Sequence, residues 1–366
     1  MSALNLRQWP HTRLGGHSDK IPITHRKMRI GVLSQNMAEL TTQPNLDDIT
    51  IFALNPDIYV EMTQEDGRIP DGAPIVNAEN LLQRYQLLSH VSLNGNQQTK
   101  QNVAMNIYIN TTSPLDAFPV ETTGSEVIAP KGSSIRLFAQ GVAKRLGTGF
   151  GFSKGMVYIK LHTPKGPVLF VNMHLPMKAT MVDGKLKNAT LGLAFRKESF
   201  FNLLVKLKSG GLLEDRPLLF VGGDLNFRMD LSGRNQLNNI IKNEPRLLYG
   251  LQELESPLGE QKGITCKFTK RNTLCRSRKL PNNTNNVADF LANIQANCGD
   301  PARTPSRCDR FLVSHDTIPL DILLNTTKYI LSGSDHNAIM CCFEVLDRPR
   351  RARGGRTLKK RRAGRW

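Results

Sequence analysis

Three short segments place carboxylates, an amide and a histidine directly beside hydrophobic runs. They are residues 223–226 (Gly-Asp-Leu-Asn), 308–310 (Cys-Asp-Arg) and 334–336 (Ser-Asp-His). Carboxylates and imidazoles are the usual proton carriers of enzymes, and oxygen ligands are those that a hard cation such as Mg²⁺ prefers. The adjoining runs are typical of buried strands, whose ends are where α/β enzymes carry their chemistry. These segments therefore predict a catalytic site at one edge of a sheet.

Residues 223–226 carry the strongest local signal. Glycine lets the backbone turn tightly as it leaves a strand, and the spacing of Asp224 and Asn226 can point both side chains the same way in extended backbone. The preceding run over 218–221, Leu-Leu-Phe-Val, predicts the buried strand that would deliver them. The alternative is an Asx turn that only closes the strand.

Other hydrophobic runs predict strands that end or begin at a polar side chain: residues 30–33 before Asn36, 58–60 before Glu65, 168–171 before His174, 311–313 after Asp309 and 339–345 after His336. Thr-Pro-Lys-Gly at 163–166 indicates a hairpin. Apolar residues at helical spacing over 191–208 predict a helix with one face packed on a sheet. Residues 121–134, rich in Gly, Thr, Ser and Pro, predict a surface loop. Strands alternating with helical and loop segments indicate an α/β domain.

The composition is ordinary for a soluble globular protein, except for its positive charge. The 366 residues are 39% hydrophobic and 22% charged, enough to bury a sizeable core. The formal net charge is +18, and the remainder is still +8 once the ten Lys and Arg of residues 348–366 are set aside. This excess favours anionic partners such as phosphorylated lipid headgroups, inositol phosphates or nucleic acid.

We expect three regions along the chain. Residues 1–27 are interpreted as a loosely ordered basic lead-in, 28–347 as a single catalytic domain and 348–366 as a disordered basic tail. The tail contains Lys-Lys-Arg-Arg at 359–362, which suits nuclear import, a tether to nucleic acid or attraction to an anionic membrane. A solubilising tail without a specific partner is the fourth alternative.

The cysteines and the N-terminus indicate a reducing compartment. The six cysteines show no CxxC pair and no regular spacing, and no signal peptide is recognisable. We therefore expect free thiols and a cytoplasmic protein, with membrane-peripheral or nuclear location open through the tail. No stretch approaches about 18 consecutive apolar residues, so no membrane span is expected.

Taken in order, the motifs resemble those of the inositol polyphosphate 5-phosphatases of the endonuclease/exonuclease/phosphatase superfamily. Asp-Leu-Asn-Phe-Arg at 224–228 and Pro-Ser-Arg-Cys-Asp-Arg at 305–310 look like signatures of that family. The resemblance implies an α/β DNase I-like fold, a four-layered sandwich of two packed mixed β-sheets flanked by helices. It also implies Mg²⁺-dependent removal of the 5-phosphate from phosphoinositides, of the phosphatidylinositol 4,5-bisphosphate type, or from soluble inositol polyphosphates by direct in-line attack of water.

The same resemblance assigns roles to individual residues. Glu65 and Asn36 match the metal-binding pair of the family. Asp224 would activate the attacking water, and Asn226 would hold a phosphoryl oxygen. The other implied catalytic residues are His174 and His336, which contact the phosphoryl group, Asp309, the partner of His336, and Asp335, which helps to orient the site.

Three cations match family contacts to further substrate phosphates, namely Lys267, Arg310 and Lys154. Two neighbours depart from the family pattern, because Cys266 replaces a tyrosine and Ser153 replaces an asparagine. These departures affect the contacts expected of Lys267 and Lys154.

Two other functions remain open beside the phosphatase. A nuclease on the same scaffold would suit the positive charge. An inactive module that binds phosphoinositides or nucleic acid would suit the departures at Cys266 and Ser153. We favour the phosphatase because Lys267 and Arg310 suit extra monoester phosphates. A binding module also has no need of an acidic and histidine set.

Overall fold

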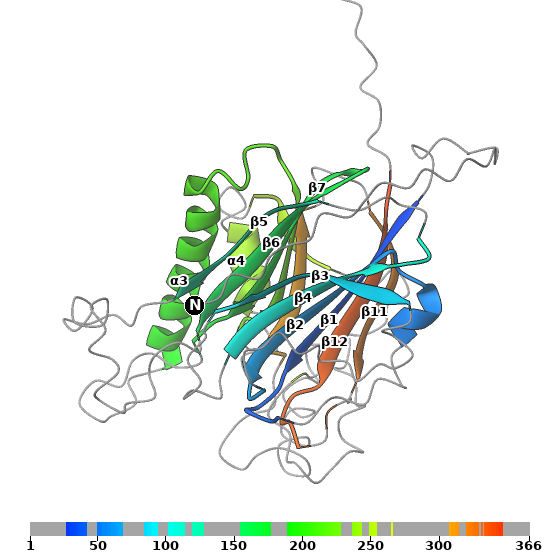
Figure 1. The fold of residues 1–366 in the computed structure, drawn as a ribbon. Coiled ribbons are helices and arrows are strands. Elements are labelled where there is room, and N and C mark those ends of the chain that lie inside the picture. The colour runs from blue at the N-terminus through cyan, green and yellow to red at the C-terminus, as the bar shows by residue number, and fades with distance from the viewer. Residues whose placement is uncertain are drawn as a thin grey trace, which may run out of the picture.

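The computed structural model describes the greater part of the predicted catalytic domain. The residues described are 27–41, 50–68, 84–93, 102–113, 119–127, 154–176, 189–227, 236–243, 249–254, 265, 307–314, 320–328, 331 and 333–346. The expected lead-in, apart from Lys27, and the expected basic tail lie outside the described residues. Within them, two β-sheets pack face to face, and helix α3 lies along the outer side of one sheet (Figure 1).

The first sheet has six strands in the order β11-β12-β1-β2-β4-β3. Strand β1 runs parallel to β2 and antiparallel to β12, so the sheet is mixed. A short 3-10 helix, η2 (Thr50–Leu54), precedes β2. The strands are β1 (Met28–Asn36), β2 (Ile58–Asp66), β3 (Tyr85–Ser92), β4 (Asn102–Asn110), β11 (Leu320–Lys328) and β12 (Ala338–Val345).

The second sheet also has six strands, in the order β5-β6-β7-β8-β10-β9. Strand β7 runs parallel to β8, and β6 pairs with β7 in the predicted antiparallel hairpin. The strands and following helices are β5 (Val120–Val127), β6 (Gly155–Thr163), β7 (Gly166–His174), α3 (Ala189–Ser209), β8 (Leu218–Asp224), α4 (Gln236–Asn243), β9 (Leu251–Glu253) and β10 (Asp309–Ser314). The predicted sandwich of two mixed sheets is confirmed.

Alternation along the strands gives each sheet an inner and an outer face. On β7, Val168 and Phe170 lie in the core between the sheets, whereas Leu169 and Val171 lie in the second core, with α3. Each fully buried side chain of this kind contributes roughly 1.5–3 kcal/mol relative to an exposed one. The predicted helix is confirmed by α3, whose buried apolar residues include Phe200, Leu203, Leu204 and Leu207.

The inner faces become polar toward one edge of the sandwich. Along β7 the alternation continues from Phe170 to Asn172 and His174, and on β8 the last residue is Asp224. Because parallel strands end at the same edge, β1 with β2 and β7 with β8 bring their carboxyl ends together. The predicted strands therefore deliver polar side chains to one place.

One predicted loop is a strand. Residues 121–127 belong to β5, which pairs antiparallel with β6 at the edge of the second sheet. An edge strand has a partner on one side only, so it tolerates the Gly, Thr and Ser that indicated a loop. The rest of the predicted loop, 128–134, lies outside the described residues.

Two further expectations concern the membrane and the thiols. No described helix is both long and apolar enough to cross a membrane. The three cysteines in the described part of the chain, Cys308, Cys341 and Cys342, are buried free thiols, as predicted.

Two glycines let β8 fit tightly against its neighbours just before Asp224. A Cβ on Gly222 would lie 2.6 Å from Sδ of Met62, which comes from the facing sheet. Gly223 has φ of +121°, and a Cβ there would lie 2.1 Å from the carbonyl oxygen of Met173 on β7. The second contact is with backbone, which cannot move aside cheaply.

We predict that Gly223→Ala lowers the free energy of unfolding by at least about 2 kcal/mol, from backbone strain and overpacking together. The matched control is Gly211→Ala, because Gly211 also has a positive φ (+76°), but among the described residues the nearest atom to its Cβ position is 3.7 Å away. Urea denaturation measures both variants. Equal losses would show that close approach to β7 does not constrain this position.

Candidate active site

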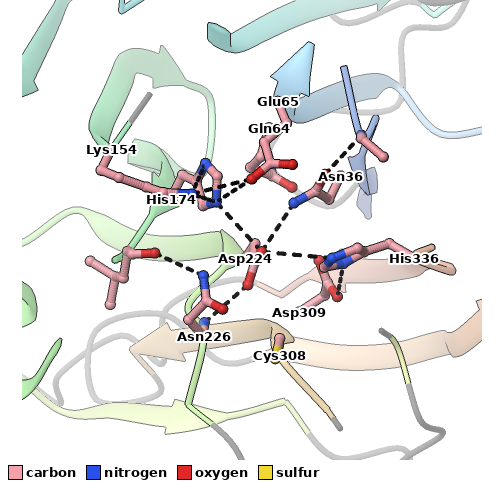
Figure 2. Close-up of polar contacts among 12 residues, drawn as sticks. Asn36, Gln64, Glu65, Lys154, His174, Asp224, Asn226, Cys308, Asp309 and His336 are labelled. Carbon is pink, nitrogen blue, oxygen red and sulfur yellow. Dashed lines mark hydrogen bonds and ion pairs between the residues drawn. The ribbon is translucent and has the colours of Figure 1, made fainter. Parts of the chain in front are cut away.

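The carboxylate of Asp224 lies at the centre of the polar edge, and its side chain is only 3% exposed. Nδ2 of Asn36 donates to Oδ2 of Asp224 at 3.0 Å, and the backbone N–H of Asn226 donates to Oδ1 at 3.0 Å. Nε2 of His174 lies 3.5 Å from the same Oδ2, and Nε2 of His336 lies 4.0 Å from it. Figure 2 shows these side chains converging on the carboxylate.

His336 and Asp309 form a buried pair on one side of Asp224. Nδ1 of His336 lies 2.9 Å from Oδ2 of Asp309, the pairing that the family resemblance implies. Burial raises the pKa of the Asp309 carboxyl, while the adjacent His336 acts in the opposite direction. With Nδ1 engaged by Asp309, Nε2 of His336 faces Asp224 and is the nitrogen available for chemistry.

His174 lies on the opposite side of Asp224, beside a lysine. Nζ of Lys154 lies 3.2 Å from Nδ1 of His174 and also contacts Nε2. Burial, and then the charge of Lys154, lower the pKa of His174 below its usual value. The imidazole is therefore neutral at pH 7.

Glu65 adds a carboxylate to the group around His174. Its Oε1 lies 3.3 Å from Nζ of Lys154 and 3.6 Å from Nε2 of His174. Burial raises the pKa of Glu65, but His174 and Lys154 outweigh burial and hold that pKa below its usual value. The carboxylate is therefore ionised at neutral pH.

Two residues of the site have backbone conformations that are uncommon for side chains with a Cβ. Glu65 has φ of 48° and Asn226 has φ of 54°. Strained backbone of this kind costs of order 1–3 kcal/mol and persists where the surrounding structure enforces it. Glu65 is the second-last residue of β2, Asn226 lies two residues after β8, and the strand residues that precede each of them are buried.

The donor set suits a hard divalent cation in one of two places. Ligand atoms of Asp224, Asp309 and His336 lie within 4.8 Å of one another. Asp309 and His336 are already hydrogen-bonded to each other, however, and a cation there would compete with that bond. Glu65, Asn36 and Asp224 offer oxygen atoms only, the ligands that Mg²⁺ prefers.

Two of the predicted residues lie at the margin of the group. Oδ1 of Asp335 lies 3.8 Å from Nε2 of His336. The side-chain amide of Asn226 donates to the carbonyl oxygen of Leu175 at 2.8 Å. In this structure Asn226 therefore joins the segment after β8 to the segment after β7, and its backbone N–H also holds the side chain of Asp224.

The three predicted phosphate-binding cations are not alike. Lys154 lies inside the site, and Lys267 lies outside the described residues. Arg310 is fully buried, and its Nη1 donates to Oε1 of Glu253 at 2.9 Å. Because neighbouring residues of a strand face opposite ways, Arg310 points away from the site when Asp309 points into it. In this structure Arg310 is therefore separated from the group around Asp224, and its contact with substrate phosphate stays a prediction.

Several residues that support the site were missed in the sequence. Oγ1 of Thr265 accepts the backbone N–H groups of Cys308 and Asp309, at 2.9 and 3.1 Å. Gln64 and Asn172 join the two sheets directly beneath the site. The available signal was alternation, since Asn172 is two residues before His174 on one face of a strand otherwise made of core residues.

We predict that Arg310→Met lowers the free energy of unfolding by about 3 kcal/mol, because it leaves the buried charge of Glu253 with less compensation. The control is Lys206→Met, which removes the exposed ion pair with Glu126 and costs less than about 1 kcal/mol. Chemical denaturation measures both. A loss in Arg310→Met as small as in the control would show that Arg310 does not stabilise the fold through Glu253.

The chain matches a known family and a known fold. The model of the Endonuclease/Exonuclease/phosphatase family 2 matches residues 96–341. The inositol polyphosphate 5-phosphatase domain of SPsynaptojanin, solved with inositol (1,4)-bisphosphate and calcium ion, aligns with a TM-score of 0.53 and 18% identity, over 87% of this chain and 84% of that chain.

Two other solved structures are also similar. A Cimex nitrophorin, solved as its ferrous NO complex, aligns with a TM-score of 0.51 and 15% identity, over 87% of this chain and 99% of that chain. TDP2 from Caenorhabditis elegans aligns with a TM-score of 0.47 and 16% identity, over 86% of this chain and 74% of that chain. No curated protein matches the chain. Identities this low show the shared fold, whereas the family match covers well over half of the sequence: the chain belongs to endonuclease/exonuclease/phosphatase family 2.

Proposed function

We propose that this hydrolase is a Mg²⁺-dependent phosphomonoesterase that removes the 5-phosphate from phosphoinositides or soluble inositol polyphosphates. The observation that carries the proposal is the geometry around Asp224, a buried carboxylate within 4.0 Å of imidazole nitrogens on both sides. Such an arrangement can take a proton from water and donate hydrogen bonds to a phosphoryl group.

Asp224 would act as the base that orients and deprotonates the attacking water. Its Oδ2 accepts a hydrogen bond from Asn36, which fixes the carboxylate in place. The backbone N–H of Asn226 fixes the other oxygen. Both contacts leave lone pairs for a water molecule, since a carboxylate has about four acceptor positions.

His336 would stabilise the charge that develops on the phosphoryl group. A proton on Nε2 makes the ring cationic, and the carboxylate of Asp309 at Nδ1 stabilises that cation. His174 lies across Asp224 and, as a neutral imidazole, can hold a phosphoryl oxygen through an N–H without adding charge. The two rings would then contact the transferring group from opposite sides.

Glu65 and Asn36 would hold Mg²⁺ at the edge of the first sheet. Glu65 is ionised, and the amide oxygen of Asn36 keeps a second lone pair while it accepts the N–H of Ala38. When bound, the cation polarises a phosphoryl oxygen as a Lewis acid. Oxygen donors of this kind favour Mg²⁺ over metals that prefer nitrogen or sulfur.

The proposed substrate class is supported by the positive charge of the chain and by the ligand of a solved structure with a similar fold. Lys154 supplies a cation next to His174 and Glu65, where a phosphate dianion would lie. The chain also carries a formal net charge of +18, which attracts polyanions. The SPsynaptojanin domain of the same fold was solved with inositol (1,4)-bisphosphate, and we carry that ligand class over to this chain.

A nuclease is the second candidate, because the same positive charge suits a nucleic-acid backbone. With Arg310 buried, Lys154 is the remaining described cation that argues for a monoester. An inactive binding module is the third candidate, and the full set around Asp224 argues against it. The candidates differ in the bond they cleave, so an assay separates them.

We predict Mg²⁺-dependent phosphate release from phosphatidylinositol 4,5-bisphosphate and from inositol 1,4,5-trisphosphate, lost on chelation. Asp224→Asn should lower kcat about 10²–10⁴-fold, since it removes the base. The matched control is Asp321→Asn on an exposed position of β11, which should leave kcat unchanged. Phosphate release is measured colorimetrically beside a plasmid-nicking assay.

The outcomes separate the three candidates. Nicking without phosphate release would replace the phosphatase by the nuclease. Silence in both assays, with the chain folded and Mg²⁺ present, would leave the binding module. Equal activity in Asp224→Asn and Asp321→Asn would remove Asp224 from the chemistry.

A further inference from the structure

The candidate site is divided between the two sheets. Asn36 and Glu65 come from the first sheet, whereas His174 and Asp224 come from the second. The contact of Asn36 with Asp224 and that of Glu65 with His174 therefore cross from one sheet to the other. Any shift between the sheets changes every one of these distances.

The core between the sheets is apolar. It consists of aliphatic, aromatic and sulfur-containing side chains, such as Val60, Met62 and Phe220. Apolar burial is non-directional, so a hydrogen bond defines the alignment of the sheets more sharply than burial itself does. Such a directional contact lies between the sheets.

An amide pair, Gln64 and Asn172, provides this directional contact. Nε2 of Gln64 on β2 donates to Oδ1 of Asn172 on β7 at 2.7 Å. Nδ2 of Asn172 returns to the first sheet, donating to the carbonyl oxygens of Thr63 at 2.9 Å and Ala104 at 2.8 Å. Nε2 of Gln64 also donates to Oγ of Ser34 on β1 at 3.1 Å. Two strands of the first sheet, β2 and β4, are thus tied directly to β7, and β1 is joined to this contact through Gln64.

The hydrogen bonds allow one orientation of each amide. Carbonyl oxygens only accept, so the atom of Asn172 facing Thr63 and Ala104 must be nitrogen. Oδ1 of Asn172 must then face Gln64, which must present its own nitrogen. The arrangement is therefore fixed by backbone groups of the first sheet, and a shift of either sheet breaks it.

Burial of the amide pair lowers the stability of the fold relative to apolar side chains of the same volume. Both side chains are fully buried, and within the part of the chain that the structure describes, Oε1 of Gln64 has no hydrogen-bond partner. A buried unsatisfied polar atom costs about 1–3 kcal/mol, and apolar side chains of the same volume would avoid that cost. Stability alone does not explain these residue types at this position.

The position of the amide pair explains why Gln64 and Asn172 are polar. Gln64 directly precedes Glu65, and Asn172 precedes His174 by two residues on the same face of β7. Figure 2 shows Gln64 beside Glu65 and across from His174. The pair therefore lies between the apolar core and the residues that would bind metal and phosphate.

We propose that Gln64 and Asn172 are positioning residues that align the two sheets and so set the distance between the metal-binding side of the site and the Asp224–His174 side. They touch neither substrate nor metal and act through Glu65 and His174. The inference rests on the proposed function for the identity of the bound metal. It concerns alignment, so it is tested through metal binding as well as through catalysis.

The test uses the full chain with four variants. Gln64→Met and Asn172→Leu keep the volume and remove the hydrogen bonds, and the double variant removes both. The control, Asn106→Leu on β4, removes another buried amide, which bonds to Glu61 on β2 and to His90 on β3. The quantities measured are the Mg²⁺ dissociation constant by calorimetry, kcat and KM, and the thermal midpoint.

We expect each single variant to weaken Mg²⁺ binding about 10-fold, the scale at which changes beyond the ligands act. We expect kcat to fall at least about 10-fold with KM little changed, because misplacement by about 1 Å can cost 10²-fold. The double variant should bind Mg²⁺ no more weakly than the more impaired of the two single variants, since each single variant already breaks the Gln64–Asn172 contact. Asn106→Leu should lower the thermal midpoint and leave Mg²⁺ affinity within about twofold, because it lies outside the shared contact.

Unchanged Mg²⁺ affinity and kcat in Gln64→Met, with a lower thermal midpoint as in Asn106→Leu, would overturn the proposal. If Asn172→Leu does not fold, Gln64→Met decides alone. Wild-type Mg²⁺ binding without phosphate release would refute the proposed function while the binding data still decide the positioning role. No Mg²⁺ binding by the wild type would overturn both.

Discussion

A single buried negative charge organises this structure. Asp224 lies almost out of contact with water, where an unpaired carboxylate would be costly. Its compensation comes from Asn36 on the first sheet, from the backbone after β8, and from imidazoles on either side. The charge can therefore be buried only when both sheets are in place, and the fold and the site form together.

The remaining features follow from bringing two sheets together at one carboxylate. Gly222 leaves room for Met62 of the facing sheet, and Gly223 lets β8 approach the backbone of β7. On the outer face of β10, Arg310 is held by Glu253, while Asp309 on the inner face holds His336. One strand thus supplies a buried ion pair on one face and the hydrogen-bond partner of His336 on the other.

Much of the fold could be predicted from the sequence, because long apolar runs bury both faces of the central strands. The edge strand β5 could not, since its composition of Val, Glu, Thr, Gly and Ser satisfies a strand only when a partner is present. Its pairing with β6 is a tertiary contact that no local pattern contains.

Residues of the site could be predicted where a short sequence motif contains them. They could be predicted less well where their role depends on which way a side chain points in the folded sheet. Asp224, His336 and Asp309 follow from short motifs. Arg310 belongs to the same motif as Asp309, but period-two alternation turns its side chain to the other face of β10. Gln64 and Asn172 carry no motif, and their importance becomes visible only when the facing sheet supplies their partners.

Anomalous scattering from crystals soaked in Mn²⁺, which binds the same oxygen ligands as Mg²⁺, would locate the divalent cation proposed for the site around Asp224. We expect one strong peak within about 2.0–2.3 Å of oxygen atoms of Glu65 and Asn36, on the Asp224 side. A peak at Asp309 and His336 that breaks their hydrogen bond, or no peak near Asp224, would contradict this expectation.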